Sequence, residues 1–241
     1  MSSGRIHGHA TELLGAGAAR LALVPVQNES GGEVWALIEI EGNRARLTCH
    51  KLWDQTRAFC TLECEAAPVA ALVADEVNAG VLRATLGMHM AMALVFDSIG
   101  AAESVLNLTV DYMKTRVQFD KPIASFQGLK HRVASMKIEA ELARHAASQA
   151  LQAVDASDPD RLVRAALSKV TATDAFAFIA GDCVQLHGGV GFTWEYDCHL
   201  YLKRARLNQA LVASNETQLD YAAAGLAAAT KADHSILELA L

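Results

Sequence analysis

Three glycines, Gly188, Gly189 and Gly191, fall within four positions of a segment that otherwise has the pattern of a helix. Glycines allow a backbone to adopt positive φ and to approach a ligand closely. Upstream, Arg116 carries a planar fork of donors that suits the oxygens of a phosphate. Together these residues predict a site for a phosphate-bearing cofactor laid across helix ends. They do not include a residue of evident acid–base or nucleophilic chemistry.

The composition bounds the possible partners. Apolar residues make up 52% of the 241 positions, enough for a sizeable buried core, and 21 basic against 27 acidic residues give a net charge of −6. An acidic chain of this kind is not expected to bind nucleic acid. Two basic clusters, at 130–132 and 203–206, are either solvated helix faces or anion contacts.

The cysteines predict neither a disulfide framework nor a metal site. They are odd in number, no C-x-x-C pair is present, and Cys60 and Cys64 are too far apart for a typical zinc pair. Reduced thiols in a cytoplasmic protein are the simplest expectation. We expect no signal peptide, because the N-terminus lacks an apolar region. We also expect no membrane span, because Asp97 and Glu103 interrupt the longest apolar run.

The first part of the chain has the alternating pattern of β-strands. Gly42-Asn43 is a hairpin signal between two of them. About four strands are too few to close a barrel, so the sheet is expected to complete itself against another surface. We assign residues 1–74 to a partial antiparallel β-domain, with strands expected at 20–26, 33–41, 45–49 and 58–65.

From about residue 75 the apolar residues recur at three- and four-residue steps, as in amphipathic helices. A first helix from 75 to 117 would be about 60 Å long, and Ser125 can cap the second. Long helices with short links predict a four-helix bundle at 75–241, so the fold class is α+β and mainly α. The further helices are expected at about 126–154, 161–187, 200–211 and from 217 onwards.

Four segments give the chain a resemblance to the C-terminal half of the acyl-CoA dehydrogenase family of flavoproteins. Their order and spacing match the family without a large gap, and residues 52–57 look like the end of its middle β-domain. The segments are DYMKTRVQFDKPI at 111–123, SFQGLKHR at 125–132, QLHGGVGFTWE at 185–195 and HLYLKR at 199–204.

The resemblance implies an N-terminal helical domain, a middle β-domain and a C-terminal bundle, with FAD held between subunits. Arg116 would meet the FAD phosphates, Phe119 would pack beside the cofactor and Gln127 would hydrogen-bond to it. Each match also has a structural alternative: Arg116 could cap the dipole of the long helix, and the glycine turn could only allow helix packing. The remaining implied FAD contacts are Gln185, Leu186, His187, Gly188, Gly189, Ser214 and Glu216.

Compared with the family, this sequence lacks the N-terminal helical domain and most of the middle domain. We therefore expect a partner subunit to help enclose the flavin and the acyl-CoA. The family's reaction also needs a carboxylate base. Its two family positions fall on Met90 and Val212, and neither side chain can accept a proton.

Asp97 is a weak substitute for the base. It lies seven residues after Met90, on the same helix face, but a solvated or arginine-paired aspartate is the alternative we prefer. Other titratable residues are weaker still as candidates: His89, Glu103, His187 and Glu216.

Three functions follow. The leading one is a non-catalytic subunit of a hetero-oligomeric, FAD-dependent acyl-CoA dehydrogenase of lipid or steroid degradation. The chain would supply adenine and pyrophosphate contacts and share the acyl-CoA substrate with its partner. The second is a structural or regulatory assembly partner that binds no flavin. The third is a homo-oligomeric dehydrogenase that uses Asp97.

Overall fold

The computed structural model describes residues 4–40 and 44–231. By its internal contacts the chain divides into two compact units, Met1–Leu86 and Gly87–Leu241. The division falls inside the long helix α1 (Ala79–Thr115).

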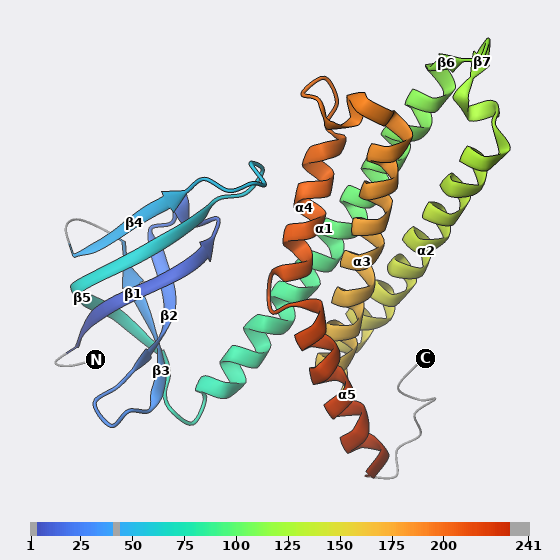
Figure 1. The fold of residues 1–241 in the computed structure, drawn as a ribbon. Helices are drawn as coiled ribbons and strands as arrows, with labels where there is room; N and C mark the ends of the chain where they lie inside the picture. The colour runs from blue at the N-terminus through green and yellow to red at the C-terminus, as the bar shows by residue number, and fades with distance from the viewer. Residues whose placement is uncertain (1–3, 41–43, 232–241) are drawn as a thin grey trace. The chain divides into compact units, whose positions relative to one another are not determined.

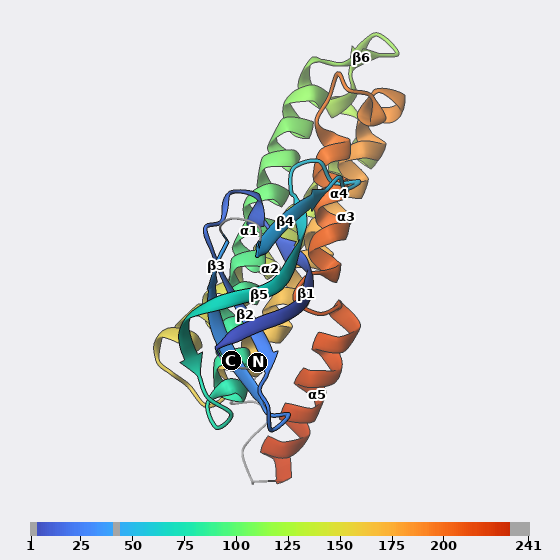
Figure 2. The same ribbon diagram turned by 90° about the vertical axis from the view of Figure 1, so that its left-hand side faces the viewer.

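The first unit is a curled antiparallel sheet with strand order β1-β5-β3-β2, in which β4 also pairs with β5. The sheet curls around the long strand β5, which pairs with several neighbouring strands. Its first half pairs with both β1 and β4, and its second half pairs with β3 (Figure 2). The strands are β1 (Arg5–Leu14), β2 (Leu21–Gln27), β3 (Glu33–Glu39), β4 (Ala45–His50) and β5 (Phe59–Ala74), with a 3-10 turn η1 (Ala16–Ala18) between β1 and β2.

Two expectations for this unit are wrong. Strand β1 was not foreseen, because its apolar residues are interrupted by Gly8 and by exposed histidines and do not alternate cleanly. A hairpin at Gly42-Asn43 was expected to pair the strands that became β3 and β4. Those strands pair with β5 instead, and the two turn residues lie outside the described part of the chain.

The expectation of reduced thiols is also wrong for one pair. Cys49 on β4 and Cys60 on β5 are directly opposite each other in the ladder and form a disulfide, with their Cα atoms 4.0 Å apart. The sequence separation of 11 residues gives no hint of this register. Cys64, Cys183 and Cys198 are free and buried.

The second unit is the predicted bundle. Helices α1 to α4 run side by side, and α5 continues from the end of α4 (Figures 1 and 2). The expected helix at 161–187 is observed with those bounds, and the others shift by a few residues. The elements after α1 are β6 (Val117–Gln118), β7 (Lys121–Pro122), η2 (Ile123–Ser125), α2 (Gln127–Asp155), α3 (Arg161–His187), η3 (Gly188–Phe192), α4 (Cys198–Ala210) and α5 (Asn215–Lys231).

Small side chains let these helices pack closely. The face that α2 buries consists of Met136 and five alanines, and it meets α3, whose Phe176 and Ile179 are fully buried. Val105 of α1 completes the same core. Removing such side chains from water supplies most of the stability of a bundle. The predicted fold class, a mainly helical α+β protein with a four-helix bundle after an antiparallel sheet, is confirmed.

Within the described residues, one helix is long and apolar enough to cross a membrane, namely α1, whose most apolar window has a mean hydropathy of 1.5. The sequence predicted no membrane span because Asp97 and Glu103 interrupt this apolar run, although the helix meets the criteria of length and hydropathy. Core helices of globular proteins meet the same two criteria, and α1 contributes Val95, Val105 and Met113 to the bundle core.

Candidate functional site

A cavity of about 740 Å³ opens at the end of the bundle where α1 and α3 finish and α2 begins. The β6–β7 hairpin lies at this end of the molecule (Figure 1). The walls come from four short stretches of chain: Tyr112, Arg116, Gln118 and Phe119; Ile123 and Phe126; Gly128, Leu129 and Arg132; and Gln185 to Val190.

Arg116 sits where α1 ends. Its backbone N–H still donates to the carbonyl of Tyr112 at 2.8 Å, and its own carbonyl accepts from Ile123 at 2.8 Å. Its side chain is exposed. Within residues 4–40 and 44–231 its guanidinium forms no hydrogen bond or ion pair, so its donors are available to an anion.

The hairpin that follows presents an aromatic ring. Phe119 and Asp120 are its two central residues, with φ of 52° and 63°, as a two-residue type I′ turn requires. Phe119 is 85% exposed, and its only ring neighbour in the described chain is Phe126, edge-on at 6.1 Å between centroids. A bulky residue in this conformation is uncommon, and it holds the ring at the rim of the cavity.

His187, the last residue of α3, forms part of the inner wall. Its ring stacks on Tyr112 with centroids 4.2 Å apart, and its Nδ1–H donates to the carbonyl of Cys183 at 2.8 Å. Burial lowers the pKa of His187 below its ordinary value of 6.5. The buried ring is therefore neutral near pH 7 and does not supply a cation to the cavity.

The glycine turn contains three glycines, and the physical reason for having a glycine differs at each position. Gly188 has φ 67° and ψ −146°, a region that only glycine occupies readily. A side chain on Gly191 would meet the carbonyl of Val184 at 2.7 Å. Gly189 has neither constraint, because a Cβ there would meet nothing within 4 Å. Its bare backbone leaves open the space into which a ligand would fit.

The start of α2 differs from the expectation. Residues 123–125 form the 3-10 turn η2, so Ser125 does not cap the helix. The N-cap is Phe126, without a side-chain hydrogen bond. Gln127 is exposed in the first turn of α2. It lies between two residues of the cavity wall, Phe126 and Gly128, without lining the cavity itself.

The structure thus brings seven of the ten predicted cofactor contacts around one cavity, with Gln127 beside it. Ser214 and Glu216 are elsewhere, where α5 begins. Ser214 is the cap of that helix: its Oγ accepts from the backbone N–H of Thr217 at 3.2 Å. Glu216 is exposed in the first turn.

In the structure, the carboxylate of Asp97 forms hydrogen bonds within the bundle and is not arranged as a catalytic base. One carboxylate oxygen accepts from Arg204 at 2.8 Å and the other from Asn208 at 2.9 Å. Both oxygens of this carboxylate are therefore occupied by donors of α4. Glu103 is likewise paired, with Arg144. Met90, at one family position for the base, is 49% exposed.

Sequence reasoning missed two features of the wall. Tyr112 was part of a matched segment without a role of its own, although it supplies the ring under His187. Arg132 was read as part of a basic cluster, but it forms a bidentate pair with Asp182, at 2.6 and 3.1 Å. Such pairings across 50 residues leave no signal in a single sequence.

Comparisons with known proteins relate the helical part of the chain to a family of known domains. Residues 78–227 match the family model described as acyl-CoA dehydrogenase, C-terminal domain. A region of 124 residues, 52% of the chain, is 43% identical to the acyl-CoA dehydrogenase IpdE2 of Mycobacterium tuberculosis and covers 37% of that protein.

Solved structures extend the likeness to the β-unit. Butyryl-CoA dehydrogenase from Megasphaera elsdenii matches 92% of the chain with a TM-score of 0.87 and 25% identity. The ChsE4-ChsE5 complex from M. tuberculosis matches 94% with a TM-score of 0.82 and 28% identity. The chain spans 60% and 61% of these two chains.

Proposed function

Since the chain belongs to the acyl-CoA dehydrogenase family, we propose that it is a subunit of an FAD-dependent acyl-CoA dehydrogenase and that its bundle holds the adenine and pyrophosphate end of the cofactor. The observation that carries this proposal is the cavity at the end of the bundle, around which Arg116, Phe119 and residues 185–189 converge.

The residues present fit such a ligand. The Arg116 guanidinium has no partner in the described chain, and a pyrophosphate would supply one. The unfilled space beside Gly189 admits close approach to backbone N–H groups. The exposed ring of Phe119 offers a flat surface of the kind that suits an adenine ring. The start of α2, with no side-chain cap, adds the positive end of a helix dipole.

When bound, FAD accepts the hydride that leaves the β-carbon of an acyl-CoA thioester. The chain's own residues bind and orient the cofactor in this proposal, and another subunit supplies the proton acceptor. Two features favour that division. Met90 and Val212 occupy the family positions for the base, and Asp97 is engaged by Arg204 and Asn208.

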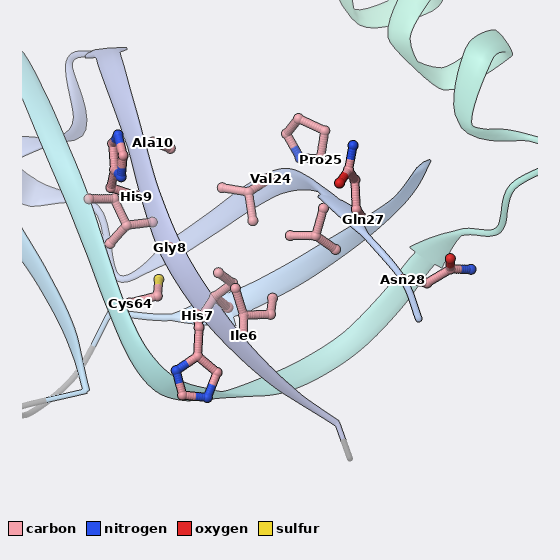
Figure 3. A pocket seen from close by; sticks show the side chains of 13 residues that line it. Ile6, His7, Gly8, His9, Ala10, Val24, Pro25, Gln27, Asn28 and Cys64 are labelled. Atoms are coloured by element: carbon pink, nitrogen blue, oxygen red, sulfur yellow. The ribbon is translucent and has the colours of Figure 1, made fainter. Parts of the chain in front are cut away.

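The β-unit supports the need for a partner. A second cavity, of about 490 Å³, lies between β1 and the β2–β3 pair, with Ile6, Val24 and Cys64 among its lining residues (Figure 3). Strands β2 and β4 each pair on one side only in the described residues. Free strand edges are typical of surfaces that another chain covers. The related ChsE4-ChsE5 structure is itself a complex of two proteins.

The experiment is co-purification of the tagged chain from its native host, followed by identification of bound chains and by absorbance spectroscopy. We expect a second acyl-CoA dehydrogenase-like subunit and absorbance bands of bound flavin. A colourless, stable assembly would instead support the alternative, a structural or regulatory partner that binds no flavin. Turnover by this chain alone would support a homo-oligomeric enzyme.

A further inference from the structure

We propose that Lys169 is a positioning residue, whose buried ammonium group holds the turn between α4 and α5 (residues 211–214, the α4–α5 turn) in a strained backbone conformation. Val212 and Ala213 have φ of 54° and 67°. Two consecutive non-glycine residues in the left-handed region, one of them β-branched, are costly. Such a conformation persists only where surrounding contacts impose it.

Lys169 on α3 makes these contacts. Its side chain is fully buried, and its Nζ donates to the carbonyls of Gln209 at 2.8 Å and Ala213 at 3.0 Å. A third hydrogen bond goes to Oδ1 of Asn215 at 2.7 Å. All three donors of the ammonium are therefore used, and the three acceptors come from the end of α4, the turn and the start of α5.

A second anchor lies one helical turn further along α3. Oδ1 of Asp174 accepts from the side-chain amides of Gln209 at 2.6 Å and Asn215 at 2.7 Å. The same two residues are thus gripped by a cation and by an anion. Burial lowers the pKa of Lys169 to about 8, which leaves it mostly charged at neutral pH. Burying a charged group costs desolvation free energy even when it has three hydrogen-bond partners. This cost indicates that the contacts of Lys169 serve a structural purpose.

The α4–α5 turn positions Ser214 and Glu216 at the start of α5, and its relevance to the cofactor rests on the function proposed above. Val212 is fixed in addition by Gln218, whose side-chain amide donates to its carbonyl at 2.5 Å. The contacts of Lys169 and Asp174 with Gln209, Ala213 and Asn215 are together called the clamp. The clamp determines the positions of Ser214 and Glu216, whether or not either residue touches the flavin.

The test compares Lys169→Met with Ser168→Ala in the assembled complex, by hydrogen–deuterium exchange of the amides at 211–218. Ser168 is also buried, and its hydroxyl has no partner in the described chain, so its removal should leave the turn unchanged. We expect exchange in Lys169→Met to rise by about tenfold or more. If that variant does not fold, Asn215→Ala removes one acceptor from the turn side and should raise exchange in the same direction.

A rescue separates positioning from a general loss of stability. Glycine accepts positive φ without strain, so adding Ala213→Gly to Lys169→Met should restore most of the protection of the turn. A core defect would not be repaired by this change. Exchange at wild-type rates in Lys169→Met, or no rescue by Ala213→Gly, would overturn the clamp. Flavin content is measured in parallel in Arg116→Ala. If this variant loses flavin while exchange in the α4–α5 turn stays at the wild-type rate, the result bears only on the cavity and the clamp remains supported.

Discussion

The ring of His187 lies flat against the ring of Tyr112, with an interplanar angle of 18° and 4.2 Å between centroids. Tyr196 packs near both rings, at 5.4 Å from Tyr112 and 5.3 Å from His187. This stack joins the last turn of α3 to the last turns of α1. It therefore fixes the two helix ends that carry the glycine turn and Arg116.

Acid should destabilise the protein through this histidine. Because burial lowers the pKa of folded His187 below 6.5, the unfolded chain takes up a proton first as the pH falls through about 6.5. The stability contributed by the neutral ring is present above that pH and is lost below it. His187→Phe keeps a ring against Tyr112 without titrating, so its denaturation midpoint should fall less between pH 7.5 and 5.5 than that of the wild type. His145→Gln, at an exposed histidine on α2, should retain the wild-type slope, and an equal slope in His187→Phe would contradict this account.

The two neighbouring glycines should respond differently to alanine. Gly188→Ala forces a side chain into a glycine-only conformation and should cost about 1–3 kcal/mol in unfolding free energy. Gly189→Ala meets nothing in the chain, so its stability should stay near the wild type, while its methyl group occupies the cavity and weakens FAD binding. Urea denaturation and FAD titration of the apo-complex measure the two effects. Normal FAD affinity in Gly189→Ala would show that the backbone of this turn is not part of the FAD site.

Arg116→Ala should weaken FAD binding by about tenfold or more, because it removes a charged contact to the pyrophosphate. Stability should hardly change, since the guanidinium has no partner in the described part of the chain. Lys114→Ala is the matched control. It removes a positive charge two residues away that is paired with Asp111 at 2.9 Å and does not line the cavity. Equal losses of flavin in the two variants would mean that Arg116 acts only through the net charge of the protein and not through a direct contact.

Asp97→Asn should behave as a structural substitution. It removes the charge that faces Arg204, so we expect a loss of about 2 kcal/mol in unfolding free energy and turnover of the complex within about threefold of the wild type, allowing for some shift in assembly. A general base contributes about 10²–10⁴-fold to the rate. A rate loss of that size without unfolding would restore Asp97 as the catalytic carboxylate.

Much of the bundle could be predicted from the sequence because helical periodicity is a local signal. The C-terminal bound of α3 follows from Gly188, which ends the helix, whereas its N-cap Asp160 makes no side-chain capping hydrogen bond. The residue types of the glycine turn and of Arg116 indicated a common phosphate site, and the resemblance to a family added the other segments around it. The stack of Tyr112 on His187 and the pair of Arg132 with Asp182 could not be foreseen, since each depends on how two helix ends meet.

The sheet was harder to predict for the same reason. Strand β5 serves three neighbours, and the pairing of β4 with β5 sets Cys49 opposite Cys60. Alternation identifies a strand but not its partner. Lys169 shows the same limit at a single residue: a lysine within a helical pattern predicts an exposed side chain, whereas the turn after α4 supplies the acceptors that permit its burial.

We propose that this chain holds the adenine end of FAD at the end of its bundle. The most direct measurement is photolabelling of the assembled complex with an FAD analogue that carries an azide on the adenine ring, followed by peptide mapping. We predict label on residues 116–128 or 185–190 of this chain, and its loss when unmodified FAD competes. Label confined to the other subunit, or spread over this chain without competition, would contradict the account.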